Sequence, residues 1–331
     1  MRVLVTGSNG FIGSHLVEKL IQHGFSVRAF VNYNSLNSIG WLDNVSQEVL
    51  SNCEIFYGDI RDSNAVYEAM KNCDIILHLA ALISIPYSYY SPDMYVETNV
   101  KGTLNILQAA RKLGVKRVIH TSTSEVYGSA LSIPINEKHP LQAQSPYSAS
   151  KISADQLAVS FHRSFDLPVS IIRPFNTFGP RQSSRAIIPT IITQILSGAK
   201  EIKVGSLHPR RDFTFVDDTV NGFIKAVNAK NIEGEIINLG TNYDISIADI
   251  ISLIFEIFEI DLKIISDNKR IRPKKSEVDR LLSDNTLAGK LINWTPFYKN
   301  KKGLKSGLEM TVEWFKKIEN FQKYNTKNYN F

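Results

Sequence analysis

The sequence is poor in cysteine and contains no pattern that predicts a metal site or a membrane segment. Cys53 and Cys73 are its only cysteines and form no C-x2-C pair, and no histidine spacing is typical of metal ligands. The chain also lacks a basic, apolar leader and any apolar run long enough to cross a bilayer. We therefore expect a cytoplasmic protein with reduced thiols, no bound metal and no membrane partner.

Long runs of one charge sign are absent as well. The formal net charge is +6 and the isoelectric point is near 9.1, yet lysine and arginine are spread along the chain. Proteins that bind nucleic acid gather their basic residues in a patch or stripe, so we expect no nucleic-acid partner. A dispersed basic excess equally suits an anionic small molecule.

The chain is long enough for a large core, with 331 residues of which 43% are hydrophobic. In its first half, short apolar runs alternate with helical patterns. The runs cover residues 3–5, 27–31, 54–57, 75–79, 118–121 and 169–173. This alternation predicts an α/β fold with a doubly wound parallel Rossmann sheet.

The alternation loosens after Arg173 and Pro174, where prolines and glycines become frequent. We expect a dinucleotide-binding Rossmann domain over residues 1–175 and a smaller α/β substrate lobe over residues 176–331. A strand at residues 235–239 is predicted to rejoin the first sheet.

Three glycines, Gly7, Gly10 and Gly13, follow the first predicted strand directly and open a helix. Glycine allows a tight turn and close approach to a pyrophosphate, whose charge the free amides of the helix N-terminus then meet. The spacing is one residue wider than the common fingerprint, and such glycines can also serve only a tight turn. Their position after an N-terminal strand favours dinucleotide binding.

The residue at the end of the second predicted strand does not distinguish NAD from NADP. An acidic residue at the end of the second strand would hold the ribose of NAD, and an arginine would favour NADP; the chain has Asn32 there. We favour NAD and leave NADP open. Asp59 is a candidate adenine contact, or it caps the following helix.

Tyr147 and Lys151 are four residues apart in a predicted helix and therefore share one face. A nearby ammonium stabilises the phenolate of a tyrosine, which can then take a proton from a hydroxyl while hydride leaves. This pair occurs by chance on many helices, but after the glycine loop we favour a catalytic function. Glu125 precedes the pair, and a carboxylate there indicates that a carbon acid also loses a proton.

Seven motifs together resemble the extended short-chain dehydrogenase/reductases that act on nucleotide sugars, from residue 1 to about residue 315. They are Gly7-x2-Gly10-x2-Gly13, residues 78–81 (His-Leu-Ala-Ala), residues 98–103 (Thr-Asn-Val-Lys-Gly-Thr), residues 123–128 (Thr-Ser-Glu-Val-Tyr-Gly), Tyr147-x3-Lys151, residues 173–176 (Arg-Pro-Phe-Asn) and residues 211–218 (Arg-Asp-Phe-x2-Val-x-Asp). The triplet at residues 123–125 is similar to that of GDP-mannose dehydratases, whereas other 4,6-dehydratases have aspartate in its middle.

The resemblance implies a catalytic set of Thr123, Ser124, Glu125, Tyr147 and Lys151. Tyr147, aided by Thr123, would deprotonate the sugar 4-hydroxyl, and Glu125 would remove the C5 proton. Ser124 would orient the leaving 6-hydroxyl, and the group that protonates it stays open. The cofactor would be recycled and tightly bound.

The resemblance also implies binding residues and a dimer. Those for the cofactor are Gly7, Gly10, Phe11, Ile12, Gly13, Asn32, Asp59, Ile60, Leu79, Ala80, Ala81, Asn99, Tyr147 and Lys151. Those for the nucleotide sugar are Ser84, Asn176, Arg181, Arg211 and Arg272. A homodimer is expected through the helices predicted at residues 98–113 and 147–165.

Two further segments, residues 33–43 and 81–89, are similar to the GDP-N-acetylglucosamine 4,6-dehydratases of the legionaminic acid pathway. We expect this activity, with UDP-N-acetylglucosamine as the other possible substrate. UDP-glucuronate decarboxylases share the Thr-Ser-Glu triplet, and a 4-epimerase or a non-catalytic cofactor-binding regulator are the remaining alternatives. An epimerase has no need of a C5 base. Loss of Tyr147, Lys151 or Glu125 would have indicated a regulator, and all three residues are present.

Overall fold

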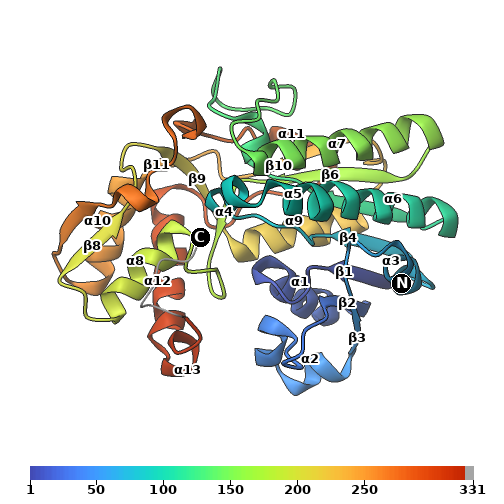
Figure 1. Cartoon of the computed structure of the whole chain (residues 1–331), viewed down its shortest axis with the longest axis horizontal. Coiled ribbons are helices and arrows are strands. Elements are labelled where there is room, and N and C mark those ends of the chain that lie inside the picture. Colours follow the sequence, from blue (N-terminus) through green and yellow to red (C-terminus); the bar gives the residue numbers. More distant parts are fainter. Residues whose placement is uncertain (325–331) are drawn as a thin grey trace.

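The computed structural model describes residues 1–324, and its largest element is a parallel sheet of seven strands (Figure 1). The strands are β1 (Arg2–Thr6), β2 (Ser26–Asn32), β3 (Cys53–Gly58), β4 (Ile75–His78), β5 (Arg117–Thr121), β6 (Val169–Pro174) and β10 (Ile236–Leu239). Their order is β10-β6-β5-β4-β1-β2-β3, and every neighbouring pair is parallel. The predicted doubly wound fold is confirmed.

Helices cover both faces of this sheet, which explains why its central strands are apolar on both sides. On one face, α1 (Phe11–Gln22) packs against α9 (Val216–Asn228). On the other, α6 (Gly102–Leu113) lies between α3 (Ser63–Met70) and α7 (Pro146–Phe165). A π-helical turn, Val96–Lys101, leads into α6.

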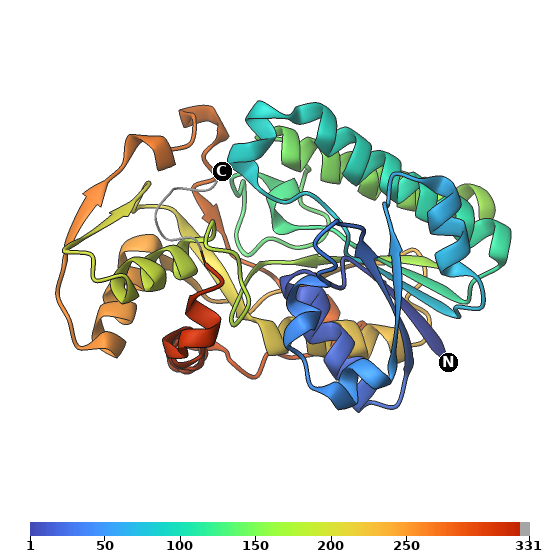
Figure 2. The same ribbon diagram turned by 60° about the horizontal axis from the view of Figure 1, so that its bottom comes forward.

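The second lobe is built on two small sheets, and Figure 2 shows it beside the first lobe. One contains β7 (Asn176–Phe178), β9 (Arg210–Phe215), β11 (Asp244–Ser246) and β13 (Arg280–Leu281), and the other pairs β8 (Glu201–Val204) with β12 (Lys263–Ser266). The remaining helices are α2 (Gln47–Ser51), α4 (Ile85–Tyr90), α5 (Pro92–Tyr95), α8 (Ile187–Leu196), α10 (Ile247–Phe258), α11 (Thr286–Ile292), α12 (Asn300–Lys316) and α13 (Ile318–Phe321). Within residues 1–324, no helix is long and apolar enough to cross a membrane.

The chain crosses between the lobes more than once. Residues 216–239 form α9 and β10, which lie on the Rossmann sheet although the chain has already entered the second lobe. A boundary at residue 175 therefore separates the lobes only at the first crossing, and the extent of the second lobe to residue 331 stays a prediction, since residues 325–331 lie outside the described part.

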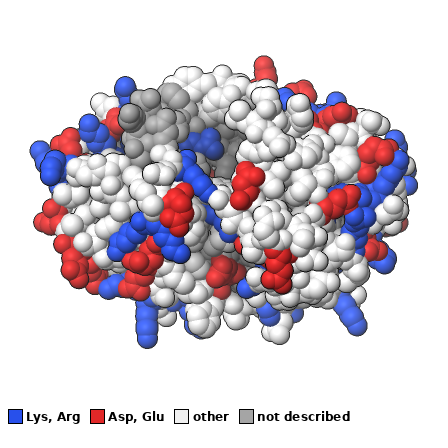
Figure 3. All heavy atoms as spheres, turned by 90° about the horizontal axis from the view of Figure 1, so that it is seen from below, with Lys and Arg blue, Asp and Glu red and all other residues white. Residues whose placement is uncertain are grey.

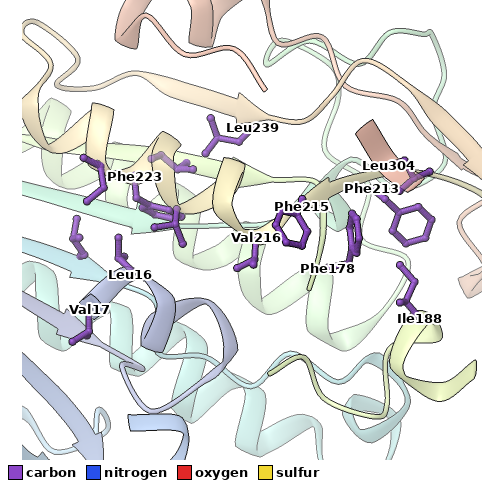
Figure 4. Close-up of a cluster of buried hydrophobic side chains, with 14 of the residues drawn as sticks. Leu16, Val17, Phe178, Ile188, Phe213, Phe215, Val216, Phe223, Leu239 and Leu304 are labelled. Atoms are coloured by element: carbon purple, nitrogen blue, oxygen red, sulfur yellow. The ribbon is translucent and has the colours of Figure 1, made fainter. Parts of the chain in front are cut away.

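One hydrophobic core joins the two lobes (Figure 4). Leu16 of α1 and Phe223 of α9 lie at one end of the cluster, and Phe178 and Phe213 of the second lobe lie at the other. Each such side chain contributes about 1.5–3 kcal/mol when it is fully buried. The lobes are thus held together by shared apolar burial, which fixes the walls of the space between them.

Candidate active site

A cavity of about 760 Å³ lies between the lobes, at the carboxyl ends of the parallel strands. In doubly wound folds this edge of the sheet is where ligands bind, and the volume suits a small-molecule ligand. Figure 3 shows a hollow in the surface with basic side chains beside it, while acidic and basic side chains are interspersed over the rest of that face.

Most of the predicted site residues line this cavity. They are Gly7, Gly10, Phe11, Ile12, Gly13, Leu79, Ala80, Ala81, Ser84, Thr123, Ser124, Glu125, Tyr147, Lys151, Asn176, Arg181, Arg211 and Arg272. The residues predicted for cofactor, chemistry and nucleotide sugar therefore share one space.

The glycine loop is packed too tightly for side chains. Gly7 has φ +67°, and a Cβ atom there would lie 2.8 Å from the backbone nitrogen of Ala80. A Cβ atom on Gly13 would lie 2.2 Å from the carbonyl oxygen of Gly7. Gly10 precedes α1 without a capping side chain from the described residues, and the first turn of α1 has no acidic residue. The cradle and the free amides fit a pyrophosphate.

Thr6 fastens the next loop to this cradle. Its Oγ1 accepts hydrogen bonds from the backbone nitrogens of Leu79 and Ala80, at 3.1 Å each, and lies 2.9 Å from Nδ1 of His78. His78 therefore serves the local hydrogen-bond pattern inside the sheet. The backbone of residues 79–81 is held beside the position where a dinucleotide would lie.

Helix α7 presents Tyr147 and Lys151 to the cavity. It begins with Pro146 after the capping residue Ser145, whose side chain accepts a hydrogen bond from the amide of Ser148. Lys151 is 3% exposed, and its Nζ donates to the carbonyl oxygen of Thr121 at 2.7 Å. This bond aims the ammonium at the end of β5.

Burial sets the pKa values of this pair. It lowers the pKa of Lys151 to about 8, against the negative charge of Asp155, which raises it. Burial raises the pKa of Tyr147 above its ordinary value; a hydrogen bond with Thr123 lowers it, and the charge of Glu125 raises it. The phenolate therefore depends on nearby positive charge.

Glu125 lies in a short 3-10 turn, Ser124–Tyr127, that follows β5. Its backbone nitrogen donates to Oγ1 of Thr123 at 3.2 Å, and its side chain is almost buried. The Nη1 atom of Arg272 lies 3.8 Å from Oε2 of Glu125. The carboxylate thus stands between the Rossmann domain and the second lobe, with a guanidinium beside it.

Two arginines and one asparagine of the second lobe face the same space. Glu277 lies 3.6 Å from Nη2 of Arg211 and 3.9 Å from Nη1 of Arg272. Within residues 1–324, the buried Arg272 Nη1 and Asn176 Oδ1 have no hydrogen-bond partner. Buried polar atoms are normally satisfied, so these two point to a polar ligand.

Arg181 differs from the other predicted substrate residues. It lines the cavity, but its Nη1 donates to Oε2 of Glu18 at 2.5 Å and to Ser14 at 3.2 Å. These bonds attach the second lobe to α1. Ser84 also has a structural function, because its Oγ caps α4.

Four predicted cofactor residues lie outside the cavity lining in the described structure. Asn32 is exposed at the end of β2. Asp59 forms an ion pair with Arg61 at 2.5 Å, and Asp62 caps α3 in its place. Ile60 is buried in the core beneath α6.

The fourth, Asn99, is buried and fully engaged. Its amide nitrogen donates to the carbonyl oxygen of Leu82 and to Oγ of Ser150, both at 2.9 Å, and its Oδ1 accepts from the amide of Leu82 at 2.8 Å. Asn99 therefore ties the loop after β4 to α7 and positions the cavity wall.

Asn9 and Trp41 line the cavity but were not predicted. The carbonyl oxygen of Asn9 accepts from the amide of Trp41 at 3.1 Å, and Gly40 has φ +64° with a Cβ position only 2.6 Å from that oxygen. The Trp41 ring lies 5.6 Å from the ring of Trp314 in α12. In the sequence, only Gly40 and Trp41 in the loop after β2 could have indicated this wall of the cavity, and a glycine followed by a tryptophan is not a pattern typical of a binding site.

Comparison with known proteins identifies the family. Residues 4–307 match the family model described as GDP-mannose 4,6 dehydratase. The chain belongs to this family. Members of this family and its relatives include dehydratases, epimerases and decarboxylases of nucleotide sugars.

Two relatives illustrate this range. The chain is 31% identical to dTDP-glucose 4,6-dehydratase of Streptomyces antibioticus over 96% of this chain and 92% of that protein. It is 32% identical to UDP-N-acetyl-alpha-D-glucosaminuronate decarboxylase of Bacillus cytotoxicus over 96% and 99%.

Solved structures agree with this family. UDP-glucuronic acid 4-epimerase of Bacillus cereus, solved with NAD and a UDP-sugar, superposes with a TM-score of 0.87 at 29% identity, covering 96% of this chain and 100% of that one. A dTDP-glucose 4,6-dehydratase of Streptomyces venezuelae, solved with NAD, gives 0.85 at 28% identity, covering 97% and 98%.

Proposed function

We propose that the protein is a nucleotide-sugar 4,6-dehydratase that converts GDP-N-acetylglucosamine, or its UDP counterpart, to the 4-keto-6-deoxy sugar. The observation that carries this proposal is Glu125, a buried carboxylate in the same cavity as Tyr147 and Lys151. Oxidation at C4 alone needs only the tyrosine and lysine. A carboxylate is a suitable base for the further loss of the C5 proton.

NAD is the cofactor that fits. The glycine cradle, the uncapped start of α1 and the loop of Leu79, Ala80 and Ala81 would hold its pyrophosphate and nicotinamide half. When bound, NAD would supply the acceptor for the hydride of C4 and the donor of that hydride to C6. The NAD complexes of the structural neighbours support this choice over NADP.

Tyr147 performs the proton transfer that accompanies hydride loss. Its hydroxyl hydrogen-bonds with Thr123, and these two hydroxyls would bracket the sugar 4-hydroxyl. The ammonium of Lys151 lies one helical turn along the same face and stabilises the phenolate. The sugar then carries a ketone at C4, which acidifies its C5 proton.

Glu125 performs the elimination. Its carboxylate removes the C5 proton and passes it to the 6-hydroxyl, which departs as water. Glu125 then takes a proton from solvent and returns it to C5, while the proton that Tyr147 took from the 4-hydroxyl is released to solvent. Ser124 is buried beside it and lines the cavity. A serine is too weak an acid to donate unaided, so we assign it the orientation of the leaving hydroxyl.

The second lobe binds the nucleotide diphosphate in this proposal. Arg211 and Arg272 offer planar guanidinium groups that donate two parallel hydrogen bonds to phosphate oxygens. Among the described residues, Arg272 Nη1 and Asn176 Oδ1 have no hydrogen-bond partner, so both are available to a polar ligand. The N-acetyl group, the guanine base and a place in legionaminic acid synthesis are supported by the similarity of residues 33–43 and 81–89 to that subgroup.

One observation favours a second candidate, the decarboxylation of a UDP-uronate. Arg272 lies 3.8 Å from Glu125, where it could hold a sugar C6 carboxylate, and the relative from Bacillus cytotoxicus is named as such a decarboxylase. A 4-epimerase would leave Glu125 without a function.

Three parallel incubations without added cofactor distinguish these activities. We expect GDP- or UDP-N-acetylglucosamine to give a product lighter by one water and with the alkaline absorbance of a 4-keto-6-deoxy sugar. Carbon dioxide released from UDP-glucuronate would establish the decarboxylase instead. An isomer of unchanged mass would establish an epimerase, and the absence of product from both N-acetylglucosamine nucleotides would refute the dehydratase.

A further inference from the structure

A buried carboxylate, Asp155, lies one helical turn beyond Lys151 on α7 and has no function in the mechanism above. Tyr147, Lys151 and Asp155 follow one another at intervals of four residues, so they share one face of the helix. Asp155 is 0% exposed. Placing a carboxylate there is costly unless it is paired and hydrogen-bonded.

Side chains on β6 and at the end of β5, two strands of the sheet beneath α7, contact the carboxylate of Asp155. Its Oδ2 accepts from Oγ of Ser122 at 2.8 Å and from Nε and Nη2 of Arg173 at 3.1 and 2.9 Å. Its Oδ1 lies 3.3 Å from Nε2 of His120. Hydrogen bonds from Arg173 of β6 and from Ser122, which follows β5, therefore hold Oδ2 of Asp155, and His120 of β5 lies beside its Oδ1.

Arg173 is itself anchored on its other side. Its Nη1 donates to the hydroxyl of Tyr127 at 2.9 Å, and this hydroxyl donates to Oδ1 of Asn238 at 2.8 Å. The guanidinium cannot turn away to another partner. Arg173 and Asp155 thus form a buried ion pair, and its carboxylate lies one helical turn from Lys151 along α7.

Among the ionisable groups around Lys151, whose ammonium donates to the carbonyl oxygen of Thr121, Asp155 is the negative one that acts on its pKa. His120 on β5 and His78 on β4 lie nearby and are neutral at ordinary pH, because burial lowers the pKa of His120 to about 4 and that of His78 well below its usual range. Asp155 is the negative group that raises the pKa of Lys151 against the effect of burial.

We propose that Asp155 is a positioning residue whose buried negative charge, one helical turn from Lys151, supports the ammonium in its place beside the catalytic tyrosine, with Arg173, Ser122 and His120 surrounding Asp155. The proposal rests on the functions proposed for Tyr147 and Lys151. The competing explanation is that Asp155 only neutralises Arg173 and stabilises the fold.

Asp155→Asn separates the two explanations, because asparagine keeps the size but removes the charge. Lys151 then loses its proton at lower pH. We expect the falling limb of kcat/KM to move to lower pH, so that at a pH of about 8 the variant keeps roughly a tenth of the wild-type value. The loss should be smaller in mild acid.

A second readout needs no substrate. The ultraviolet absorbance of the Tyr147 phenolate, taken as the difference between a protein and its Tyr147→Phe variant, reports the ionisation of Tyr147 in the NAD-bound enzyme. The charge of Asp155 also raises the pKa of Tyr147 directly, so the shift is compared with that of Asp155→Asn in a Lys151→Met background, where only this direct effect is left. Relative to that background, we expect Asp155→Asn to move the ionisation of Tyr147 to higher pH when Lys151 is present, because the phenolate has lost its cation. A shift without turnover of any nucleotide sugar by the wild type would support the positioning function and refute the dehydratase.

The matched control is Asp244→Asn. Asp244 is 7% exposed and pairs with two arginines, Arg210 and Arg280, in the second lobe. The Asp244→Asn variant should have a lower unfolding temperature, but neither the falling limb of kcat/KM nor the ionisation of Tyr147 should move. If Asp155→Asn folds poorly, the double variant Asp155→Asn, Arg173→Met removes both buried charges and should still show the shift. Reduced stability with unchanged pH profiles in these variants would overturn the proposal.

Discussion

Glu125 distinguishes elimination from simple oxidation at the scale of single residues. In the proposed mechanism it acts only after the C4 ketone has formed. Glu125→Gln should therefore lower the rate of dehydration by about 10²- to 10⁴-fold, the usual contribution of a general base, while hydride transfer to NAD continues. Reduced cofactor should accumulate on the enzyme and can be followed by its absorbance.

Glu137→Gln is a suitable control for this variant. Glu137 is a partly buried carboxylate outside the cavity lining whose Oε1 accepts from the backbone nitrogen of Asn238, and glutamine keeps an acceptor there. It should dehydrate as the wild type does. Normal dehydration by Glu125→Gln would contradict the function proposed for Glu125.

The lowered pKa of Lys151 predicts how activity falls at alkaline pH. Its pKa is lowered to about 8, so the ammonium is present below this pH and is lost as the pH rises through it. Since the phenolate of Tyr147 needs this cation, kcat/KM should fall above a pH of about 8. Lys151→Arg keeps its charge to much higher pH; its residual activity should show no such fall. The same falling limb in both proteins would assign it to another group.

Sequence reasoning predicted the residues whose chemistry is recognisable locally and missed those defined by packing. Glu125, Tyr147 and Lys151 form short motifs, and all three line the cavity. Asp155 lies four residues after Lys151, yet its burial beside Arg173 appears only when β5 and β6 are in place. Asp59, in contrast, was predicted from its local sequence but does not line the cavity, and it forms an ion pair with the nearby Arg61.

At the scale of elements, the glycine loop carries the sharpest prediction. Gly13→Ala would improve the intrinsic helix propensity of α1, but the new Cβ would lie 2.2 Å from a backbone oxygen that cannot move aside. The start of α1 should shift, and the purified protein should lose most of its bound NAD, as measured after denaturation and release.

Gly289→Ala provides the comparison. Gly289 lies inside α11, and its nearest neighbour to a new Cβ is 3.8 Å away. This variant should keep its NAD and gain roughly 0.5–1 kcal/mol in the free energy of unfolding. Full NAD content in Gly13→Ala would contradict the pyrophosphate cradle.

The elements of the first half follow from sequence because each strand and helix is locally consistent and the helical crossover connections impose parallel order. The second lobe depends on contacts between distant segments. Asp212, which follows Arg211 in one predicted motif, accepts hydrogen bonds from Thr241, Asn242 and Ser283 and so joins three segments. Nothing in its immediate sequence indicates these partners.

For the whole molecule we propose a homodimer through the outer faces of α6 and α7. These helices lie side by side, and Phe165 at the end of α7 is 44% exposed with the guanidinium of Arg111 3.7 Å from its ring centre. Sedimentation at micromolar concentration should give the mass of two chains. Phe165→Asp should shift the distribution toward monomer, whereas a monomeric wild-type protein would refute the dimer.

The shared core between the lobes matters for the central claim, because one closed cycle requires the cofactor, Glu125 and the nucleotide sugar to stay in one cavity. Hydride taken from C4 must return to C6 of the same molecule. This requirement can be followed with an isotope.

GDP- and UDP-N-acetylglucosamine carrying deuterium at C4 provide the most direct measurement. We predict a product lighter by one water that retains the deuterium at C6, located by mass spectrometry and nuclear magnetic resonance. Deuterium that remains at C4, returns to C4 of an epimer, or is lost to solvent would contradict internal redox elimination by this protein.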